Sequence, residues 1–379
     1  MKKVILMPDS FKGTMSSSEI CAIMKARILE HFPDCEIESI PVADGGEGTV
    51  ECFLEAMNGE RVTLGVKGPF MEDIEGFYAI VEGGKTAIIE MAATASLPMV
   101  HGRENPCLTT TFGVGQLIRD AVSRGCKKIV VGLGGSCTND MGAGAAAGAG
   151  AIFRDASGKQ FVPTGSTLEK IASIDVSAIR ELLCGVEVVA MCDIDNPLYG
   201  PTGAAYVFSP QKGADEKTVK LLDNNLRACS ETVKKELGID VSLLAGAGAA
   251  GGMGAGMVAF FGATLKAGIE TVLDTVGFER IASDADFIFT GEGKIDSQSL
   301  RGKVVIGIAQ RAAKLPVPVI AVVGDIGDNM EPAYDMGVSA IYSINRVAVD
   351  FSKAKHRSKS DLSLTMDTVM RTLKLGANM

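Results

Sequence analysis

Three loops of the sequence combine lysine or carboxylate side chains with glycine where a predicted strand leads into a helix. They cover residues 9–14, 43–49 and 291–298, the last followed by Gly302 and Lys303. In an open α/β sheet, ligands bind outside the carboxyl ends of the strands. Turn and capping chemistry explains roughly half of these residues individually, but three such loops at one sheet edge favour a site for an anionic, metal-bound ligand. The residues expected to converge there are Lys12, Asp44, Asp296 and Lys303.

Glycines in the middle of the chain indicate a second place for phosphate. Gly134, Gly135 and Ser136 follow a strand predicted over residues 128–133 and precede an Ala/Gly helix predicted over 141–150. Backbone amides without side chains, in front of a helix N-terminus, suit phosphate oxygens. Small residues also permit tight helix packing, so the sequence leaves both interpretations open.

Two further polar segments lie in the same part of the chain. Asp193 and Asp195 come directly after a predicted apolar strand. Carboxylates are good ligands for hard cations such as Mg²⁺, although an Asx turn before Pro197 is an alternative. Lys212 precedes a long amphipathic helix predicted over 216–237, where it either contacts a nucleotide phosphate or is solvated. The sequence therefore offers Asp193 as a metal ligand and Lys212 as a nucleotide ligand.

Residues 246–251 match the pattern G-x-G-x-x-G, with Glu270 about twenty residues further along, as in dinucleotide-binding folds. However, residues 240–244 before this match make a poor strand, and more glycines follow it. We therefore interpret the segment as a compact phosphate or adenosine loop that includes Gly248 and Gly251. A nicotinamide-dependent dehydrogenase is the weaker alternative.

Several classes of protein are excluded by what the sequence lacks. Residues 83–86 approach a Walker A motif, but Ala79 stands where its first glycine is needed, so a P-loop kinase is excluded. Nine cysteines without a CxxC pair and three scattered histidines suggest neither a disulfide framework nor a zinc site. A net charge of −9 without a basic stripe excludes a nucleic-acid surface. No apolar run has membrane-spanning length, so we expect a cytoplasmic chain; the sequence leaves open whether it forms a homodimer.

The two ends of the chain predict one flavodoxin-like, doubly wound α/β domain. Apolar runs predict five strands, over residues 4–8, 36–41, 286–290, 317–323 and 340–343. Five strands with intervening helices suffice for such a sheet. The middle of the chain predicts a second, mixed α/β domain inserted in the first. The predicted boundaries are 1–60 with 280–379 for the flavodoxin-like domain and 61–279 for the inserted one.

Taken together, these loops resemble the type I glycerate kinase family, the bacterial glycerate 2-kinases. The matching runs are residues 9–13, 41–49, 134–140, 192–193, 196–198, 210–214, 246–254, 291–293, 296, 298 and 302–303. They cover nearly the whole chain in order. The departures are Cys137 where alanine is usual, Ser209 where glycine is common and Ser299 where threonine is common, and none is at a charged position.

The resemblance implies transfer of the γ-phosphate of ATP to D-glycerate with Mg²⁺, giving 2-phosphoglycerate. It also implies two α/β domains, one of them flavodoxin-like, with a cleft between them. The position of the phosphorylated hydroxyl rests on this resemblance alone. The remaining alternatives are a kinase for another small hydroxy acid and a non-catalytic protein that binds sugar acids.

On this reading each candidate residue receives a role. Lys12 and Lys303 hold the glycerate carboxylate or the transferring phosphoryl group, and Asp296 takes the proton of the acceptor hydroxyl. Asp193 is the Mg²⁺ ligand, although the sequence does not decide whether Asp193 or Asp296 is the base. The substrate-binding candidates are Ser10, Asp44 and Gly45, and the nucleotide-binding candidates are Gly134, Gly135, Ser136, Lys212, Gly248 and Gly251.

Overall fold

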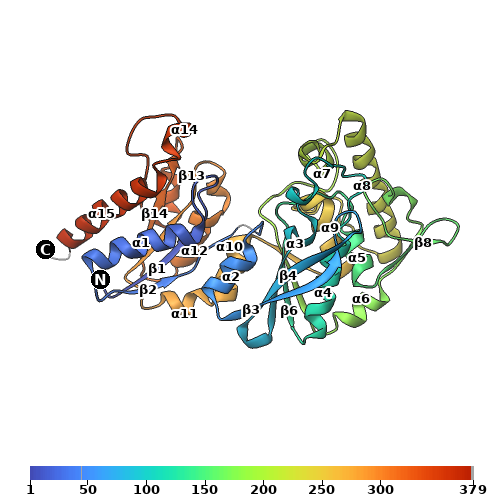
Figure 1. Ribbon diagram of the computed structural model, residues 1–379, viewed down its shortest axis with the longest axis horizontal. Helices are drawn as coiled ribbons and strands as arrows, with labels where there is room; N and C mark the ends of the chain where they lie inside the picture. Colours follow the sequence, from blue (N-terminus) through green and yellow to red (C-terminus); the bar gives the residue numbers. More distant parts are fainter. Residues whose placement is uncertain (44, 377–379) are drawn as a thin grey trace. The chain divides into compact units, whose positions relative to one another are not determined.

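The computed structural model describes residues 1–43 and 45–376, which form two compact α/β units (Figure 1). The end unit contains the described residues of 1–44 and 267–379, and the middle unit is Gly45–Lys266. The predicted α/β class is confirmed. The chain passes from one compact unit to the other at 44/45 and 266/267, whereas the predicted domain boundaries are 60/61 and 279/280. The predicted domain boundaries stay a prediction.

A five-stranded parallel sheet forms the centre of the end unit, in the order β2-β1-β12-β14-β16. Within this unit the order is 2-1-3-4-5, that of flavodoxin-like sheets. The strands are β1 (Lys3–Pro8), β2 (Glu36–Ser39), β12 (Phe287–Gly291), β14 (Val319–Val323) and β16 (Val338–Ser343), with a small pair β13 (Lys294–Ile295) and β15 (Asp325–Ile326). The helices are α1 (Ser17–His31), α10 (Gly268–Val276), α11 (Phe278–Ala282), α12 (Val304–Ala312), α13 (Pro332–Asp335), α14 (Phe351–Ala354) and α15 (Ser358–Gly376).

Helices cover both faces of this sheet, which is why its inner strands are buried runs rather than alternating ones. Val4 and Leu6 of β1 share a core cluster with α1 and α15. No residue of α12 belongs to that cluster, yet α12 packs on β12 and β14, so it covers the opposite face. Ser16 caps α1 in a capping box with Glu19, as the sequence predicts.

The middle unit contains a six-stranded mixed sheet in the order β11-β10-β6-β5-β4-β3. The first four of these strands are parallel, and β3-β4-β5 form an antiparallel meander. The strands are β3 (Gly59–Lys67), β4 (Asp73–Val81), β5 (Thr86–Glu90), β6 (Lys128–Gly132), β10 (Glu187–Met191) and β11 (Thr264–Lys266), with a small sheet of β7 (Ile152–Arg154), β8 (Gln160–Phe161) and β9 (Ser173–Asp175). The helices are α2 (Thr49–Ala56), α3 (Ala92–Ala95), α4 (Phe112–Ser123), α5 (Ala143–Ala149), α6 (Ser177–Leu182), α7 (Ala204–Phe208), α8 (Glu216–Leu237) and α9 (Ala249–Phe261).

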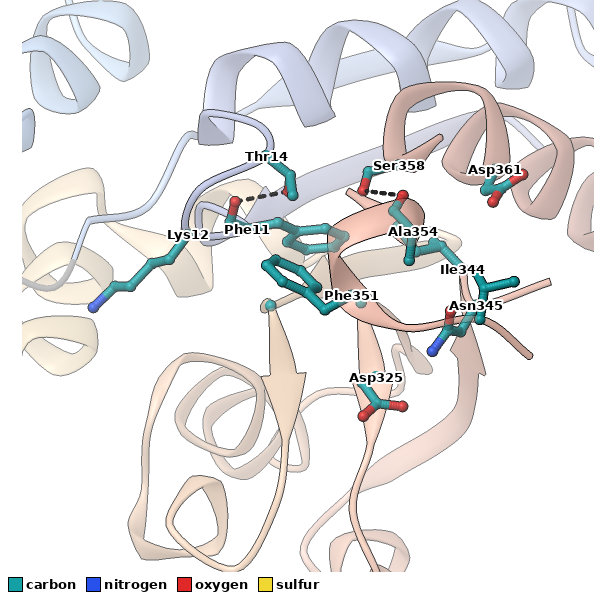
Figure 2. A pocket seen from close by; sticks show the side chains of 13 residues that line it. Phe11, Lys12, Thr14, Asp325, Ile344, Asn345, Phe351, Ala354, Ser358 and Asp361 are labelled. Carbon is teal, nitrogen blue, oxygen red and sulfur yellow. Dashed lines mark hydrogen bonds between the residues drawn. The ribbon is translucent and has the colours of Figure 1, made fainter. Parts of the chain in front are cut away.

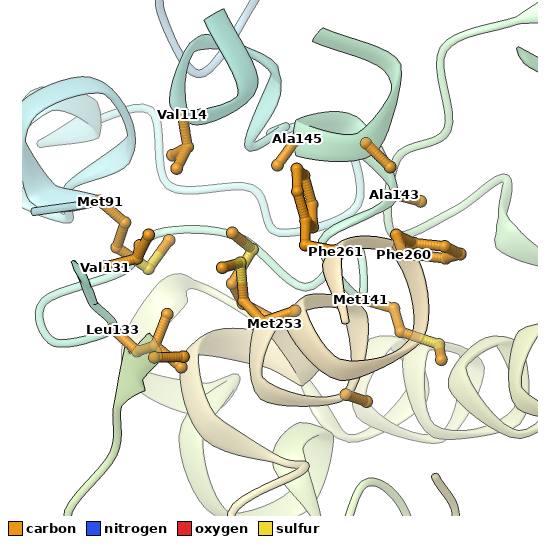
Figure 3. Close-up of a cluster of buried hydrophobic side chains, with 14 of the residues drawn as sticks. Met91, Val114, Val131, Leu133, Met141, Ala143, Ala145, Met253, Phe260 and Phe261 are labelled. Atoms are coloured by element: carbon orange, nitrogen blue, oxygen red, sulfur yellow. The ribbon is translucent and has the colours of Figure 1, made fainter. Parts of the chain in front are cut away.

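Buried hydrophobic side chains, among them Met141, Met253 and Phe261, form the core of the middle unit (Figure 3). Glycines bring the helices around this core into close contact. A Cβ added at Gly115 of α4 would lie 1.9 Å from the Ala145 carbonyl oxygen of α5. One added at Gly148 of α5 would lie 2.1 Å from the Phe112 carbonyl oxygen of α4. Tight packing therefore accounts for the small residues of α5.

The interpretation of residues 246–251 and the glycines after them as one compact loop is wrong from Met253 onward. Helix α9 begins at Ala249, has left-handed backbone from Ala250 to Gly252, and is regular from Met253 onward. Several positions of this helix require glycine because other chain segments lie directly against it: an added Cβ would lie 2.2 Å from the Gly246 carbonyl oxygen at Gly254 and 2.1 Å from the Met141 carbonyl oxygen at Gly256. Among the described residues, no helix combines the length and apolar character needed to cross a membrane.

Candidate active site

In the end unit, the loops after β1 and β12 meet at the carboxyl ends of two adjacent parallel strands. The Asp9 backbone N–H donates to the Gly291 carbonyl oxygen at 2.8 Å. A Cβ added at Gly293 would lie 3.6 Å from the Lys12 backbone nitrogen. The strand order reverses between β1 and β12, and in doubly wound sheets this switch point is where ligands bind.

The loop after β14 completes this edge. The N–H groups of Gly324 and Asp325 donate to the carbonyl oxygens of Glu292 and Gly293 at 3.0 and 3.1 Å. A Cβ added at Gly324 would lie 2.2 Å from the Gly293 oxygen, so only glycine permits this approach. Three loops that are far apart in the sequence thus form one surface.

The structure places Asp296 and Lys303 together in the segment that follows β12. The Gln298 backbone N–H donates to Asp296 Oδ1 at 2.9 Å, and Lys303 Nζ donates to Gln298 Oε1 at 3.3 Å. Lys303 is the N-cap residue of α12, and its side chain is exposed. Lys12 is also exposed, in the neighbouring loop.

Glu292 is a residue of this edge to which the sequence analysis gave no role. Its side chain is 7% exposed, and its Oε1 has no hydrogen-bond partner among the described residues. Burial raises the pKa of Glu292 to about 7, with a further rise from Asp9 and Asp296 that the Ser299 hydroxyl and Lys303 oppose. Its place between two glycines directly after a buried strand is the signal that could have identified it.

A hollow of about 240 Å³ adjoins these loops (Figure 2). Its walls come from the segments after β1, β12, β14 and β16 and from the start of α15. Figure 2 shows the rings of Phe11 and Phe351 beside each other, whereas the Lys12 side chain extends away from Phe351. The loop after β1 is held in shape by the Thr14 hydroxyl, which donates to the Phe11 carbonyl oxygen at 2.8 Å.

In the middle unit, Lys212 is buried rather than solvated, contrary to one of the two alternatives for it. Its side chain is 2% exposed, and its Nζ donates to Ser136 Oγ and to the Thr138 carbonyl oxygen, both at 2.7 Å. Burial lowers the pKa of Lys212 to about 8. Nearby, burial raises the pKa of Asp140, whose Oδ2 accepts from the Thr111 N–H at 2.7 Å.

The three predicted phosphate ligands before α5 differ in their surroundings. The Gly134 N–H donates to the Gly45 carbonyl oxygen at 2.9 Å, and a Cβ added at Gly134 would lie 2.5 Å from the Gly46 Cα. Ser136 is buried and bonded to Lys212. Gly135 is exposed, with a φ of +75°. Of the three, Gly135 therefore presents backbone to solvent.

Gly248 and Gly251 lie against the chain itself. The Gly248 N–H donates to the Asn196 carbonyl oxygen at 3.0 Å. A Cβ added at Gly251 would lie 2.0 Å from the Thr138 carbonyl oxygen. Packing accounts for both glycines, and their role in nucleotide binding stays a prediction. Residues 240–245 contain no strand, so the dinucleotide-binding pattern lacks its structural context.

Asp193 and Asp195 are exposed after β10. Within 1–43 and 45–376, no three or more His, Cys, Asp or Glu side chains are grouped to hold a metal ion. Mg²⁺ that enters with a nucleotide needs only one or two carboxylates besides the phosphates, and Asp193 fits that requirement. The Ser10 N–H donates to Asp9 Oδ1 at 2.6 Å, Gly45 is buried with a φ of +83°, and Asp44 lies outside the described residues.

Comparison with known proteins identifies the family. The sequence model of the glycerate kinase family matches residues 4–374. The chain is 40% identical over 378 residues to "Glycerate kinase" of Bacillus subtilis, covering 100% of this chain and 99% of that one. It is 40% identical over 375 residues to "Glycerate 2-kinase" of Escherichia coli, covering 99% and 98%. A crystal structure of a candidate glycerate kinase 2 from Salmonella typhimurium LT2 superposes with a TM-score of 0.88 at 39% identity, over 100% of both chains. The resemblance read from the loops is confirmed: this chain belongs to the glycerate kinase family.

Proposed function

We propose that this chain transfers the γ-phosphate of ATP to the 2-hydroxyl of D-glycerate, giving 2-phospho-D-glycerate and ADP. The observation that carries the proposal is the 40% identity over 375 residues to the Escherichia coli protein named glycerate 2-kinase. The surface formed by the loops after β1, β12 and β14 supports it, because it presents lysines and carboxylates at the switch point of the sheet.

Phosphoryl transfer depends mainly on positioning and on neutralising charge. Lys12 and Lys303 are exposed cations of this surface, and we assign them to the glycerate carboxylate and the transferring phosphoryl group. Ser10, Asp44 and Gly45 are the further candidates for contact with glycerate. The exposed backbone at Gly135 is our first candidate for contact with the phosphates of ATP.

Asp296 is our candidate to accept the proton of the acceptor hydroxyl. Its carboxylate accepts from the backbone N–H of Gln298, and the side-chain oxygen of Gln298 accepts from Lys303, so base and cation are held in one segment. Glu292 acts on this pair as a positioning residue: when ionised, it adds a negative charge beside Asp296, which favours movement of the proton toward that carboxylate.

Asp193 is the candidate to hold Mg²⁺, and Asp195 is the second carboxylate of the same segment. The ion, when bound with ATP, supplies positive charge to the phosphate oxygens. We also propose a cytoplasmic location, supported by nine cysteines of the described residues that form no disulfide with one another. Assembly as a homodimer stays a prediction.

The proposal is tested by ³¹P NMR of the product formed from ATP, Mg²⁺ and D-glycerate. We expect one phosphomonoester whose phosphorus couples to the proton on carbon 2, and ADP in equal amount. Glycerol is the control acceptor, because it lacks the carboxylate that a lysine would bind. A phosphomonoester at carbon 3, or equal phosphorylation of glycerol, would contradict the proposal.

A further inference from the structure

The hollow beside Phe11 and Phe351 has no role in the function proposed above. We propose that it binds the adenine ring of the phosphate donor, stacked on Phe351. The inference rests on the proposed function in one respect: it takes the donor to be ATP.

The position of the hollow suits a nucleotide. It lies at the carboxyl ends of β1, β12, β14 and β16, and Gly293 and Lys12 are shared between its wall and the surface of the candidate active site. Ligands of open α/β sheets bind at this edge. A base in the hollow would leave its sugar and phosphates to extend past Lys12, whose side chain points away from Phe351 (Figure 2).

The size of the hollow suits a base rather than a whole nucleotide. Sites that enclose drug-sized ligands measure roughly 300–1,000 Å³, and this hollow measures about 240 Å³. A single heterocycle fits within such a volume, and ribose and phosphates would extend from it.

The walls combine aromatic surface with hydrogen-bond acceptors. Phe351 is 65% exposed and lines the hollow, so its ring is accessible to a ligand there. Aromatic rings are stacking platforms for nucleobases. Asp325, Asn345 and the 4% exposed Asp361 place side-chain oxygens in the same wall, where the amino group of adenine can donate a hydrogen bond.

The same carboxylates argue against glycerate as the occupant. Asp325 and Asp361 line the wall, and the cations beside them are already paired: Lys294 Nζ lies 3.8 Å from Asp325 Oδ2, and Arg357 donates to both Asp361 oxygens at 3.1 Å. Neither cation is left to attract a carboxylate into the hollow. The hollow therefore favours a neutral, planar donor of hydrogen bonds over a small anion.

The chain contains no tryptophan, so a single reporter can be placed on the stacking surface. In Phe351→Trp, ADP and adenosine should quench the indole fluorescence with saturation, and inorganic tripolyphosphate should not. The matched control is Tyr334→Trp in α13, a half-exposed aromatic of the same unit that does not line the hollow. Its fluorescence should not respond to any of the three ligands.

Phe351→Ala should raise KM for ATP about tenfold, the effect of losing one base–aromatic stack, with KM for D-glycerate unchanged. Absence of quenching by ADP in an active enzyme would overturn the adenine site and leave the proposed function standing. Equal quenching by tripolyphosphate would also overturn it, since the response would then come from phosphate. Quenching by adenosine in a protein that does not phosphorylate glycerate would reject the proposed function and keep the site.

Discussion

The ammonium nitrogen of Lys212 lies 2.7 Å from the hydroxyl oxygen of Ser136, in the interior of the middle unit. The same nitrogen donates to the Thr138 carbonyl oxygen, so the lysine holds the segment between Gly135 and Asp140 by two hydrogen bonds. A cation is used here to hold a loop in place. Its burial has a consequence for stability that can be measured.

Stability should rise with pH above 8 because of Lys212. Its pKa is about 8 in the folded chain and near 10.5 in the unfolded chain, so the folded state binds fewer protons between these values. The free energy of unfolding should therefore increase through this window, by an amount on the order of 3 kcal/mol for a shift of this size. Below pH 8 the contribution of Lys212 should be constant.

Urea unfolding of wild type and Lys212→Met at pH 7 to 10.5 measures this effect as a difference, so that other groups cancel. The difference should grow in favour of wild type as pH rises. Lys217→Met, on the exposed face at the start of α8, is the control and should follow wild type. A difference that is independent of pH would show that Lys212 keeps an ordinary pKa.

Lys12→Met should lower turnover by roughly 10²–10³, the cost of removing one aligned electrostatic contact. Its side chain is exposed, so the free energy of unfolding should change little. Lys25→Met, at an exposed position of α1, is the matched control. Steady-state kinetics of both variants check the prediction, and wild-type turnover in Lys12→Met would remove Lys12 from the site.

Activity should fall below pH 7 because Glu292 takes up a proton there. Its pKa is raised to about 7 by burial, so the carboxylate is lost as pH falls through this value. Profiles of kcat/KM against pH should show this decline below pH 7 in wild type, and the decline should be absent in Glu292→Gln. Asp296→Asn should reduce turnover by roughly 10²–10⁴ at pH 8, and it should also lack the decline below pH 7, because Glu292 acts through Asp296. If the activity of Glu292→Gln still declines below pH 7, another group is responsible for the decline.

Burial of Glu292 also makes the free energy of unfolding depend on pH, and here stability falls as pH rises, whereas for Lys212 it increases. Its folded pKa of about 7 lies above the ordinary value of 4.5, so its contribution is present below pH 4.5 and is lost as pH rises through 7. Glu292→Gln should thus gain stability relative to wild type between these values. Thermal unfolding of the two proteins at pH 4.5 and 8 measures this change.

The sequence predicts what local patterns determine. Residues 4–8 and 286–290 are predicted to be strands because both are largely apolar, one ending at Pro8 and the other followed by Gly291, and they correspond to β1 and β12 of the end unit's sheet. Asp296 and Lys303 are predicted to converge because their segment follows a strand at the sheet edge, and the structure shows both of them bonded to Gln298. The α/β class followed from the alternation of strands and helices.

What the sequence could not give depends on contacts between distant segments. Glu292 has a raised pKa because the loops after β1 and β14 cover it, and no local pattern reports that burial. The sequence predicts a solvated or ligand-binding Lys212, because its hydrogen bonds to Ser136 and Thr138 join segments that are far apart in the chain. The hollow likewise needs four strand ends to be brought together by the fold.

Alanine substitutions at Gly251 and Gly135 distinguish a glycine that close packing requires from a glycine that is proposed to bind a ligand. Both have left-handed backbone, with φ of +69° and +75°, so alanine at either costs roughly 1–2 kcal/mol. At Gly135 the added Cβ would find its nearest neighbour 3.7 Å away, at Ala92 Cβ, which is ordinary contact. At Gly251 it would lie 2.0 Å from the Thr138 carbonyl oxygen, and the backbone would have to move.

Gly251→Ala should therefore destabilise the protein by roughly 1–3 kcal/mol more than Gly135→Ala, the usual cost of overpacking. Chemical denaturation of the two variants measures the difference. Gly135→Ala should lose no more stability than the cost of placing alanine in left-handed backbone. It should raise KM for ATP, because the added methyl group obstructs the exposed backbone that is proposed to contact the phosphates. Equal stability of the two variants would show that Gly251 is not required by packing, and an unchanged KM in Gly135→Ala would remove Gly135 from the nucleotide site.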